Sequence, residues 1–392
     1  MEGARPDFRE CKMSIVIIFR NELLPISETF IEAQVRSLKS FRPQYVGLVP
    51  AGHSLPLPPN AIFLCGRRSR LSRVLAAAYK SVGHPRRAYS RVREAGANLL
   101  HAHFALDGAT ALPLRAFLKI PLLVTLHGYD VTTTDATFRK TIGGRLYLAR
   151  RRQLWEKASL FLCVSQFIRK KAIDAGFPEK KLVVHYIGID RQLFDYAPNQ
   201  ISRRSVLFVG RLVEKKGCSY LIEAMADIQK RHPDAELIIV GEGPEHAALV
   251  ERAKQLSLHC RFMGARPQST IHQLLQSARV FCVPSVTAAT GDSEGLGMVF
   301  AEAQAMGVPV VSFQHGGIPE VVRHGETGLL ATERDTVMLG QYIERLITDD
   351  QLWEEFSRAG SAWVRHRFDL EKQTKELEEL YESVAKNPEG SQ

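Results

Sequence analysis

The sequence predicts an α/β protein with two domains, each built around a parallel sheet. The chain has 392 residues, too many for one ordinary hydrophobic core. Short, β-branched and nearly all-apolar runs at 14–19 and 205–209 are typical of strands buried on both faces of a parallel sheet. A polar stretch over 194–204 lies between these runs and predicts the domain boundary. The expected units are residues 1–195, 196–367 and a closing segment over 368–392.

The composition is that of a globular protein. Hydrophobic residues make up 45% of the chain and charged residues 24%. No apolar run approaches the ~20 residues that a membrane-spanning helix needs. The run at 15–19 follows a leader of mixed charge, so a first strand explains it better than a signal peptide does. We therefore expect a cytoplasmic protein that does not cross a membrane.

The net charge of +10 is concentrated in one segment, because residues 61–100 contain nine Lys or Arg and one Glu. The part between Arg67 and Arg93 is basic and amphipathic. Its apolar residues at helical spacing are Leu71, Val74, Leu75, Ala78 and Val82. Such a segment fits an anionic membrane surface, where each cation adds about 1 kcal/mol. The alternative is a core-packed helix with a solvated cationic face. Nucleic acid is disfavoured, because no recognition module accompanies the charge.

The first strand leads into an amphipathic helix. Ser27, Glu28 and Thr29 precede apolar residues that recur at helical spacing. Thr29 and Glu32 have the spacing of a capping box. Either these polar residues only begin the helix, or they form a loop that faces a ligand.

Histidines follow two later strands of the first domain. His101 and His103 alternate along a predicted strand and share one face, but no further ligand lies nearby at metal-type spacing. We expect them in the core or in the wall of a cleft. His127 comes directly after the strand at 121–126, at a carboxyl end where open α/β sheets bind ligands. The alternative for His127 is a loop histidine satisfied by the backbone.

The second domain opens with a strand, a cationic loop and a helix from about Gly217. Gly210 ends the strand, and Arg211 and Lys216 follow it. A guanidinium fork and an ammonium both suit a diphosphate, whereas the alternative is ordinary surface charge. The later run Gly241-Glu242-Gly243-Pro244 lacks the third glycine of a dinucleotide fingerprint, which argues against NAD.

The stretch over 283–306 is the most informative. A strand ends near Pro284, a polar loop follows, and Glu294-Gly295-Leu296-Gly297 turns into an Ala-rich helix. The two glycines leave backbone exposed where a ligand could approach, and unpaired N–H groups at the helix start suit a phosphate. Glu302 lies inside the helix among small apolar residues, where a glutamate usually has a partner. The alternative is that Glu294 caps the helix and Glu302 forms a salt bridge.

These residues carry a resemblance to a known family. Glu294 and Glu302, bracketing Gly-Leu-Gly, look like the signature of retaining glycosyltransferase family 4. The runs at 305–311, 316–322 and 325–330 continue the match, and family features recur from residue 25 to the end. Within the family, the chain is similar to bacterial enzymes that assemble exopolysaccharide repeat units of the colanic-acid and amylovoran types.

The resemblance implies the GT-B fold: two Rossmann-like domains facing each other across a cleft, with a C-terminal helix crossing back to the first domain. It implies a retaining, metal-independent hexosyltransferase that uses a UDP-sugar or a GDP-sugar, with UDP preferred. The acceptor would be a polyprenyl-diphosphate-linked oligosaccharide or another glycan at the inner face of the membrane. The nucleotide sugar is a co-substrate, so no cofactor and no metal is expected.

The family pattern also implies roles for residues. His127, Glu294, Arg211 and Lys216 are the expected catalytic residues. The expected donor-binding residues are Gly210, Arg211, Lys216, Glu294, Gly295, Leu296, Gly297 and Glu302. Of these, Glu294 would hold sugar hydroxyls and Glu302 the ribose, with His127 contacting the sugar from the opposite domain. Ser27, Glu28 and Thr29 form a possible donor or acceptor loop. Because fold does not fix function, a nucleotide-sugar epimerase and a non-catalytic basic membrane-binding protein remain alternatives.

Overall fold

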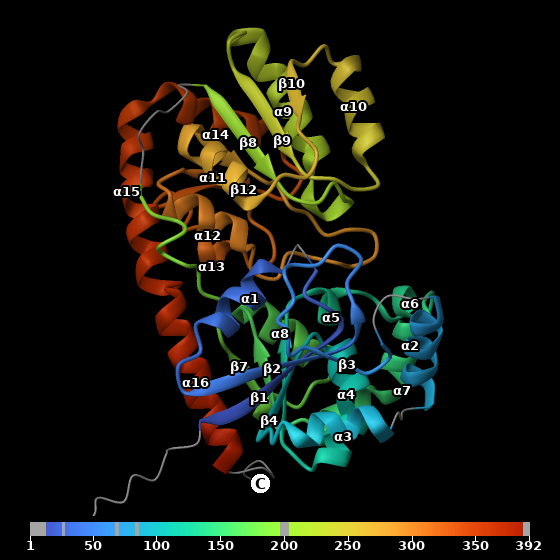
Figure 1. Cartoon of the computed structure of the whole chain (residues 1–392). Coiled ribbons are helices and arrows are strands. Elements are labelled where there is room, and N and C mark those ends of the chain that lie inside the picture. Colours follow the sequence, from blue (N-terminus) through green and yellow to red (C-terminus); the bar gives the residue numbers. More distant parts are fainter. Residues whose placement is uncertain (1–12, 26–27, 67–69, 83–85, 197–203, 387–392) are drawn as a thin grey trace, which may run out of the picture.

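A computed structural model of the chain describes residues 13–25, 28–66, 70–82, 86–196 and 204–386. Within them it contains two parallel sheets flanked by helices, one in each half of the chain (Figure 1). This arrangement confirms the predicted two-domain α/β class. Ser27, Arg67, residues 197–203 of the predicted linker and the tail from residue 387 lie outside the described residues.

The first sheet has the strand order β3-β2-β1-β4-β5-β6-β7, and every pair of neighbours is parallel. Its central strands are buried on both faces, as their apolar sequences require. The strands are β1 (Ser14–Leu23), β2 (Phe41–Pro50), β3 (Ile62–Phe63), β4 (Leu99–His103), β5 (Leu122–Leu126), β6 (Leu160–Cys163) and β7 (Leu182–Val184).

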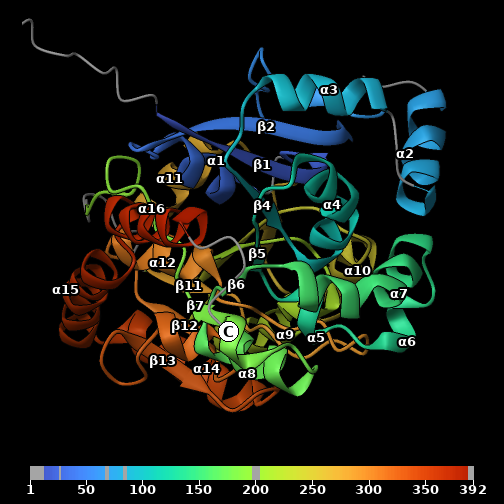
Figure 2. The same cartoon turned by 90° about the horizontal axis from the view of Figure 1, so that it is seen from below.

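Helices cover both faces of this sheet. Figure 2 shows α1 and α16 on one side of it and α4 and α7 on the other. The helices are α1 (Thr29–Arg36), α2 (Arg70–Val82), α3 (Arg86–Glu94), α4 (Ala105–Leu118), α5 (Tyr129–Thr132), α6 (Asp135–Phe138), α7 (Ile142–Lys157), α8 (Gln166–Asp174) and the short η1 (Glu179–Lys181). The capping box predicted for α1 is wrong. Glu28 is the N-cap residue and makes no side-chain cap bond, because its carboxylate is bound to Arg20.

The second sheet has the order β10-β9-β8-β11-β12-β13. Its strands are β8 (Ser205–Val209), β9 (Glu236–Val240), β10 (Cys260–Phe262), β11 (Val280–Cys282), β12 (Val310–Phe313) and β13 (Gly328–Ala331). The helices are η2 (Glu214–Lys216), α9 (Cys218–Arg231), α10 (His246–Gln255), α11 (Gln268–Ser277), α12 (Met298–Ala305), α13 (Ile318–Val321), α14 (Thr336–Thr348) and α15 (Asp350–Arg367).

The order of strands reverses at one point in each sheet, between β1 and β4 in the first and between β8 and β11 in the second. Ligands of open α/β sheets bind beyond the carboxyl ends of strands at such switch points. His127 follows β5, Arg211 follows β8 and Glu294 lies in the connection after β11. The topology therefore brings the residues selected from the sequence to the edges of the sheets where a site is expected.

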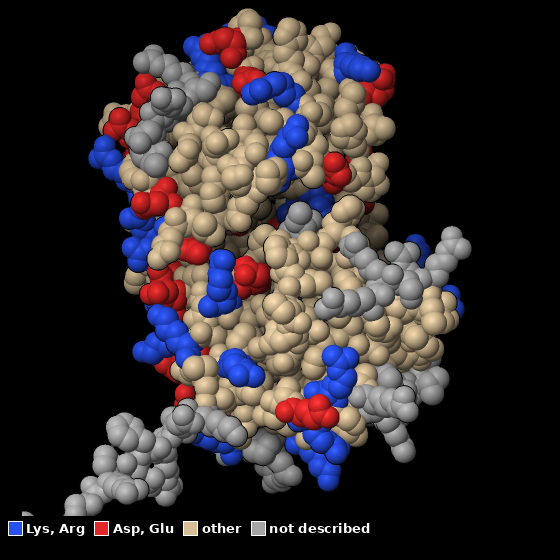
Figure 3. All heavy atoms as spheres, in the orientation of Figure 1, with Lys and Arg blue, Asp and Glu red and all other residues tan. Residues whose placement is uncertain are grey.

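The final helix, α16 (Leu370–Lys386), returns to the first domain, as the resemblance predicted. In Figure 1, α15 and α16 run along one edge of both domains, and Figure 3 shows charged side chains of both signs along that edge. Tyr381 is buried against Phe41 with a ring-centroid distance of 5.2 Å. The carboxylate of Glu378 accepts hydrogen bonds from three consecutive backbone N–H groups, those of Lys39, Ser40 and Phe41. These contacts fix the helix to the start of β2.

None of the helices in the described ranges combines the length and the hydropathy of a bilayer-spanning segment.

Replacing Glu378 by Ala tests the anchoring of α16. We expect the free energy of unfolding to fall by roughly 2 kcal/mol, because three backbone donors lose a charged acceptor near the core. Glu379→Ala is the matched control, since the Glu379 side chain is 66% exposed. Guanidinium denaturation followed by circular dichroism compares the two variants. Equal stability of both variants would show that Glu378 does not hold the helix.

Candidate functional site

The two domains meet where the loop after β5 touches the loop after β11. A side chain added at Gly295 would lie 2.0 Å from the carbonyl oxygen of His127, so the two backbones are in direct contact. The Ser165 hydroxyl donates to the Gly295 carbonyl over 2.6 Å. The Ser293 N–H donates to the Thr132 hydroxyl over 3.2 Å. A cleft between the domains is therefore closed by backbone contacts at this point.

Both glycines of the Gly-Leu-Gly turn are required by the chain itself. Gly295 is needed because its missing side chain makes room for the His127 carbonyl of the other domain. Gly297 has φ +84°, a conformation that strains other residues, and an added Cβ would also meet the Phe300 ring at 2.4 Å. The sequence analysis explained these glycines by the approach of a ligand. The structure shows that packing within the chain also requires them. The amides that begin α12 are positioned by this turn.

Glu294 is bound to Lys216 at the bottom of the site. The Lys216 ammonium lies 2.5 Å from the Glu294 carboxylate, and both side chains are largely buried. Burial alone would raise the pKa of Glu294, but the charges of Lys216 and Lys215 lower it to about 2. Lys215 is itself paired with Asp292 at 3.0 Å. Glu294 is therefore ionised at neutral pH, and it is fixed at a place where its oxygens can accept hydrogen bonds.

His315 supports Glu294 from below and was not found from the sequence. It follows β12 and is buried, with Nδ1 2.9 Å from the carboxylate of Glu333. Its Nε2 accepts a hydrogen bond from the Glu294 N–H over 3.3 Å. Since Nε2 accepts, the ring proton is on Nδ1 and donates to Glu333. His315 could have been selected from the sequence only because it lies between the end of a strand and the pair Gly316-Gly317.

Arg211, unlike Lys215 and Lys216, is available to bind a ligand. Its side chain is exposed at the carboxyl end of β8, and it makes no ion pair with any described residue. Gly210 precedes it. A Cβ added at Gly241 would lie only 1.9 Å from the carbonyl oxygen of Gly210. The glycine-rich run at 241–243 therefore packs under the Arg211 loop, which explains its glycines without a phosphate. An exposed guanidinium with no protein partner suits an anionic ligand.

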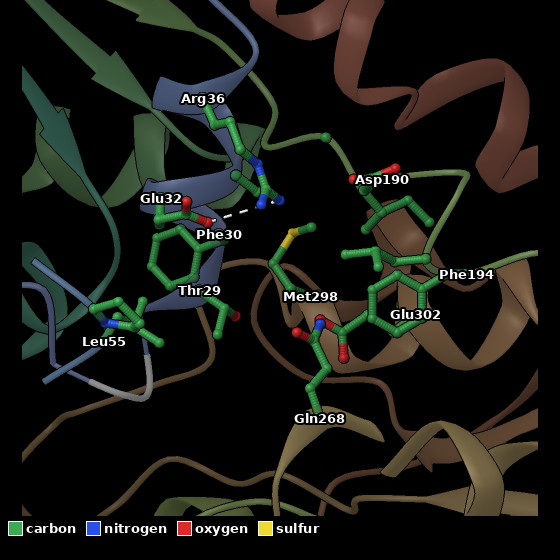
Figure 4. Close-up of a pocket in the computed structure, with 15 residues that line it drawn as sticks. Thr29, Phe30, Glu32, Arg36, Leu55, Asp190, Phe194, Gln268, Met298 and Glu302 are labelled. Atoms are coloured by element: carbon green, nitrogen blue, oxygen red, sulfur yellow. Dashed lines mark ion pairs between the residues drawn. The ribbon is translucent and has the colours of Figure 1, made fainter. Parts of the chain in front are cut away.

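Glu302 opens onto a cavity of about 350 Å³ between the domains. Figure 4 shows its carboxylate beside Gln268 and Met298, opposite residues of α1. The side chain has no hydrogen bond or ion pair with any described residue, so the salt bridge considered for it is not formed there. Burial raises the pKa of Glu302 to about 7. An acid poised near neutrality at the edge of a cavity is a good acceptor for ligand hydroxyls.

Helix α1 supplies the opposite wall of this cavity. Thr29 and Phe30 line it, as Figure 4 shows. Glu28 does not, because both of its oxygens bind Arg20 in a buried ion pair. Arg20 also binds Asp107. Of the predicted loop, Thr29 faces the cavity, Glu28 anchors the start of the helix, and Ser27 lies outside the described residues.

His127 lies between aromatic rings at the edge of the first sheet. Its ring centroid is 5.3 Å from Phe30 and 4.5 Å from Phe104. Burial, followed by the charge of Arg20, holds the pKa of His127 well below its usual value. Asp130, which was not identified from the sequence, accepts from the Gly128 N–H over 3.0 Å and fixes the turn that carries His127. His127 is therefore a neutral, well-positioned imidazole at neutral pH.

His101 and His103 are buried in the first domain, as expected. His101 lies between the hydroxyls of Tyr381 and Thr125, at 2.6 and 2.7 Å. Nowhere in the described part of the chain do three or more His, Cys, Asp or Glu side chains form a group arranged to hold a metal ion.

The basic segment folds as α2 and α3. Leu71, Val74 and Leu75 point into solvent, with exposed fractions of 65%, 64% and 47%. The inward face of α2 is formed instead by Ser72, Ala76 and Tyr79. The helix therefore packs on the core, as the alternative expected, but through these residues and not through the two leucines and the valine. The helix exposes apolar side chains, and exposed groups of such side chains mark interaction surfaces.

Two family models match the two halves of the chain. Residues 28–193 match the family model described as Glycosyltransferase Family 4. Residues 197–363 match the model described as Glycosyl transferases group 1. The two matches meet at the predicted linker between the domains.

Two relatives act in bacterial polysaccharide biosynthesis according to their names. The putative colanic acid biosynthesis glycosyltransferase WcaL of Escherichia coli strain K12 is 30% identical over 296 residues, covering 74% of this chain and 71% of the relative. The amylovoran biosynthesis glycosyltransferase AmsK of Erwinia amylovora is 32% identical over 297 residues, with the same coverage of 74% and 71%.

Solved structures share the fold. HepE of Anabaena, in complex with UDP and glucose, has a TM-score of 0.76 at 22% identity, over 94% of this chain and 100% of that one. Sucrose-phosphate synthase of Thermosynechococcus elongatus has a TM-score of 0.72 at 20% identity, over 95% of this chain and 99% of that one. The fold is therefore GT-B, as predicted. With both halves matched by family models and a relative 32% identical over most of its length, the chain belongs to glycosyltransferase family 4.

Proposed function

We propose that this glycosyltransferase moves a hexose from a nucleotide diphosphate sugar to a hydroxyl of a lipid-linked oligosaccharide, with retention of the anomeric configuration and without a metal. The observation that carries the proposal is the ionised Glu294 held by Lys216 where the two domains touch. Such a site offers a fixed acceptor for sugar hydroxyls and fixed positive charge for a diphosphate. The nucleotide sugar is a co-substrate, and no further cofactor takes part.

The leaving group is the chemical difficulty of this reaction. As the bond between the anomeric carbon and the phosphate oxygen breaks, the electron pair leaves with the diphosphate and the sugar becomes cationic. Fixed donors at the distal phosphate stabilise this state. Arg211, Lys216 and the amides of Gly295, Leu296 and Gly297 supply them. The acceptor oxygen then bonds to the same face of the sugar, and its proton passes to the departing phosphate oxygen.

The donor is held from both domains in this proposal. Glu294 accepts hydrogen bonds from sugar hydroxyls, and His127 contacts the sugar from the first domain. Glu302 accepts from the ribose hydroxyls at the edge of the 350 Å³ cavity. Thr29, at the start of α1, faces the cavity and contacts the donor or the acceptor. Because each domain brings part of the site, turnover requires the cleft to open and close.

The comparisons supply support for the donor base and the acceptor. HepE is described in complex with UDP and with UDP-glucose, which favours UDP over GDP for this chain. WcaL and AmsK are named for colanic acid and amylovoran biosynthesis, which favours an exopolysaccharide pathway. Such repeat units grow on polyprenyl diphosphate, so the acceptor would lie at the cytoplasmic face of the membrane.

The exposed face of α2 is the proposed membrane contact. Leu71, Val74 and Leu75 can enter the boundary between headgroups and acyl chains, while Lys80, Arg91 and Arg93 meet anionic headgroups. The enzyme is then a peripheral protein whose acceptor arrives along the surface that it binds. Two alternatives are a nucleotide-sugar epimerase and a silent membrane-binding protein, and the tests below separate them.

The test of transfer is release of nucleotide from a panel of UDP- and GDP-sugars, in membranes that carry lipid-linked acceptors. We expect one nucleotide sugar of the panel to release its nucleotide, and only when the lipid-linked acceptor is present. Arg211→Ala should lower that rate by about 100-fold, as removal of a transition-state donor does. Glu294→Ala should lower it by about the same factor, because the sugar hydroxyls lose their charged acceptor. Arg252→Ala is the control, because Arg252 is an exposed arginine of the same domain that pairs with Glu223. An epimerase would act without acceptor, and release from no donor would contradict the proposal.

Glu302 predicts a pH dependence of donor binding. Its ionised carboxylate accepts ribose hydroxyls with both oxygens and more strongly than the protonated acid does, and with a pKa of about 7 the ionised fraction rises with pH through neutrality. The KM for the donor should therefore fall between pH 6 and pH 8, as expected for a group with this pKa. Glu302→Gln should remove this dependence. Glu32→Gln, on the opposite wall of the cavity, should keep it. An unchanged profile in Glu302→Gln would rule Glu302 out as the ribose acceptor.

Vesicle binding tests the membrane contact. The triple change Leu71→Ser, Val74→Ser and Leu75→Ser should weaken binding to phosphatidylglycerol vesicles by more than about tenfold, because buried apolar area drives insertion. Val337→Ser is the matched control, since Val337 is 72% exposed on α14 of the other domain. Neutral phosphatidylcholine vesicles measure the electrostatic contribution. The proposed membrane contact would be contradicted if the wild-type protein did not bind anionic vesicles, or if the triple variant bound them as well as wild type.

A further inference from the structure

His103 is a buried histidine to which the reaction described above gives no task. It ends β4, directly beside β5, which leads to His127. The Nδ1 atom of His103 lies 3.1 Å from the Nε2 atom of His127, and the two rings are stacked with centroids 5.3 Å apart. The other nitrogen of His103, Nε2, is buried and has no hydrogen-bond partner among the described residues. The pair has therefore one internal hydrogen bond and one orphan atom.

Both rings are neutral at neutral pH. Burial holds the pKa of His103 well below its usual value, and the neighbouring histidines and Arg20 lower it further. Burial and then Arg20 do the same for His127. Arg20 is close enough to donate to the His103 carbonyl over 3.2 Å. Each imidazole therefore carries a single proton, and the hydrogen bond between the two rings needs that proton on one side.

Only two arrangements of the protons satisfy this bond. If His127 donates from Nε2, then His103 accepts at Nδ1 and must bury an N–H at Nε2 without a partner. If His103 donates from Nδ1, its Nε2 is a bare lone pair and no N–H is orphaned. Buried N–H groups without partners are very rare in proteins, whereas unused acceptor positions are tolerated more often. The second arrangement is the more stable.

The surroundings hold the pair in this geometry. Phe104, the next residue, has φ +73°, a strained conformation for a bulky side chain. Its ring lies 4.5 Å from the guanidinium of Arg20 and 4.5 Å from the ring of His127. Strain of this kind persists only where the surrounding packing fixes it, and it is common at functional sites. The His127 ring is thus packed on one side by Phe104 and tethered at Nε2 by His103.

We propose that His103 is a positioning residue that fixes the tautomer of His127, so that His127 presents an N–H at Nδ1 as a hydrogen-bond donor. Nδ1 of His127 has no partner among the described residues. Taken together with the proposed function, on which this step rests, the donor N–H meets an oxygen of the transferred sugar. A neutral donor suits a sugar that becomes cationic, because an imidazolium there would repel the developing charge.

The tautomer can be measured directly and without turnover. In protein labelled with ¹⁵N-histidine, two-bond proton–nitrogen correlation spectra identify the protonated nitrogen of each ring. His127→Gln assigns the His127 signals by their loss. We expect the proton of His127 on Nδ1 in the wild-type protein. A proton on Nε2 would overturn the proposal whether or not the protein transfers sugar.

Two substitutions at His103 test whether this residue determines the tautomer of His127. An asparagine at this position places its amide N–H near the former Nδ1, so His103→Asn should keep the His127 tautomer and most of the activity. His103→Leu removes the donor, so the Nδ1 preference of His127 should be lost and kcat/KM for the donor should fall about 2- to 10-fold, the value of one hydrogen bond. His101→Gln is the control, since His101 stacks on His103 but bonds to Tyr381 and Thr125.

The outcomes separate this inference from the proposed function. An unchanged His127 tautomer in a folded His103→Leu protein would overturn the inference while leaving the transferase intact. The wild-type protein could instead show the predicted His127 tautomer, lose it in His103→Leu, and yet transfer no sugar. That result would contradict the proposed function but support the role of His103. Circular dichroism establishes that each variant is folded. If His103→Leu does not fold, the comparison of His103→Asn with wild type decides, because a shifted tautomer there contradicts the proposal.

Discussion

The backbone contact between the His127 carbonyl and Gly295 is the constraint on which the site depends. It joins the end of a strand in the first domain to the turn before α12 in the second, and no residue other than glycine fits at position 295. Because the contact is made by main chain, it brings His127 and Glu294 to the same place without using either side chain. The side chains are thereby left available for a ligand. Mutation of Gly295 would separate the domains before it altered any chemistry.

Electrostatics then divides the site into parts with different protonation. Glu294 beside two lysines is ionised far below neutral pH. Glu302 has no ion-pair partner among the described residues, and desolvation raises its pKa to about 7. His127 is held neutral by burial and by the charge of Arg20. Thus one acid is permanently charged, one titrates near neutrality, and the imidazole is uncharged. In the proposed function, this pattern suits an uncharged sugar held between the carboxylate of Glu294 and the cations Arg211 and Lys216.

The sequence predicted the fold and the principal residues because they depend on local pattern. Apolar runs of β-branched residues mark strands buried on both faces, and the spacing of Glu294 and Glu302 around Gly-Leu-Gly is specific to a family. His315 and Asp130 were not identified, and His103 was expected in the core or a cleft wall without its contact to His127. These roles arise from contacts between strands and loops that are distant in the chain. Local pattern also failed at α1, where Glu28 bonds to Arg20 and the capping box does not form. On α2, apolar spacing was recognised, but the side facing solvent could only be seen once the helix was packed.

In the proposed reaction, an intact sugar moves to an acceptor with its configuration retained. The most direct measurement uses a UDP-sugar labelled with ¹³C at the anomeric carbon, incubated with the enzyme and a lipid-linked acceptor, and follows that carbon by NMR. We expect the label to leave the nucleotide and to appear in a glycosidic bond to the acceptor with the anomeric configuration of the donor. A label that appears with inverted configuration would contradict the mechanism. A label that stays on the nucleotide as an epimer would contradict transfer itself.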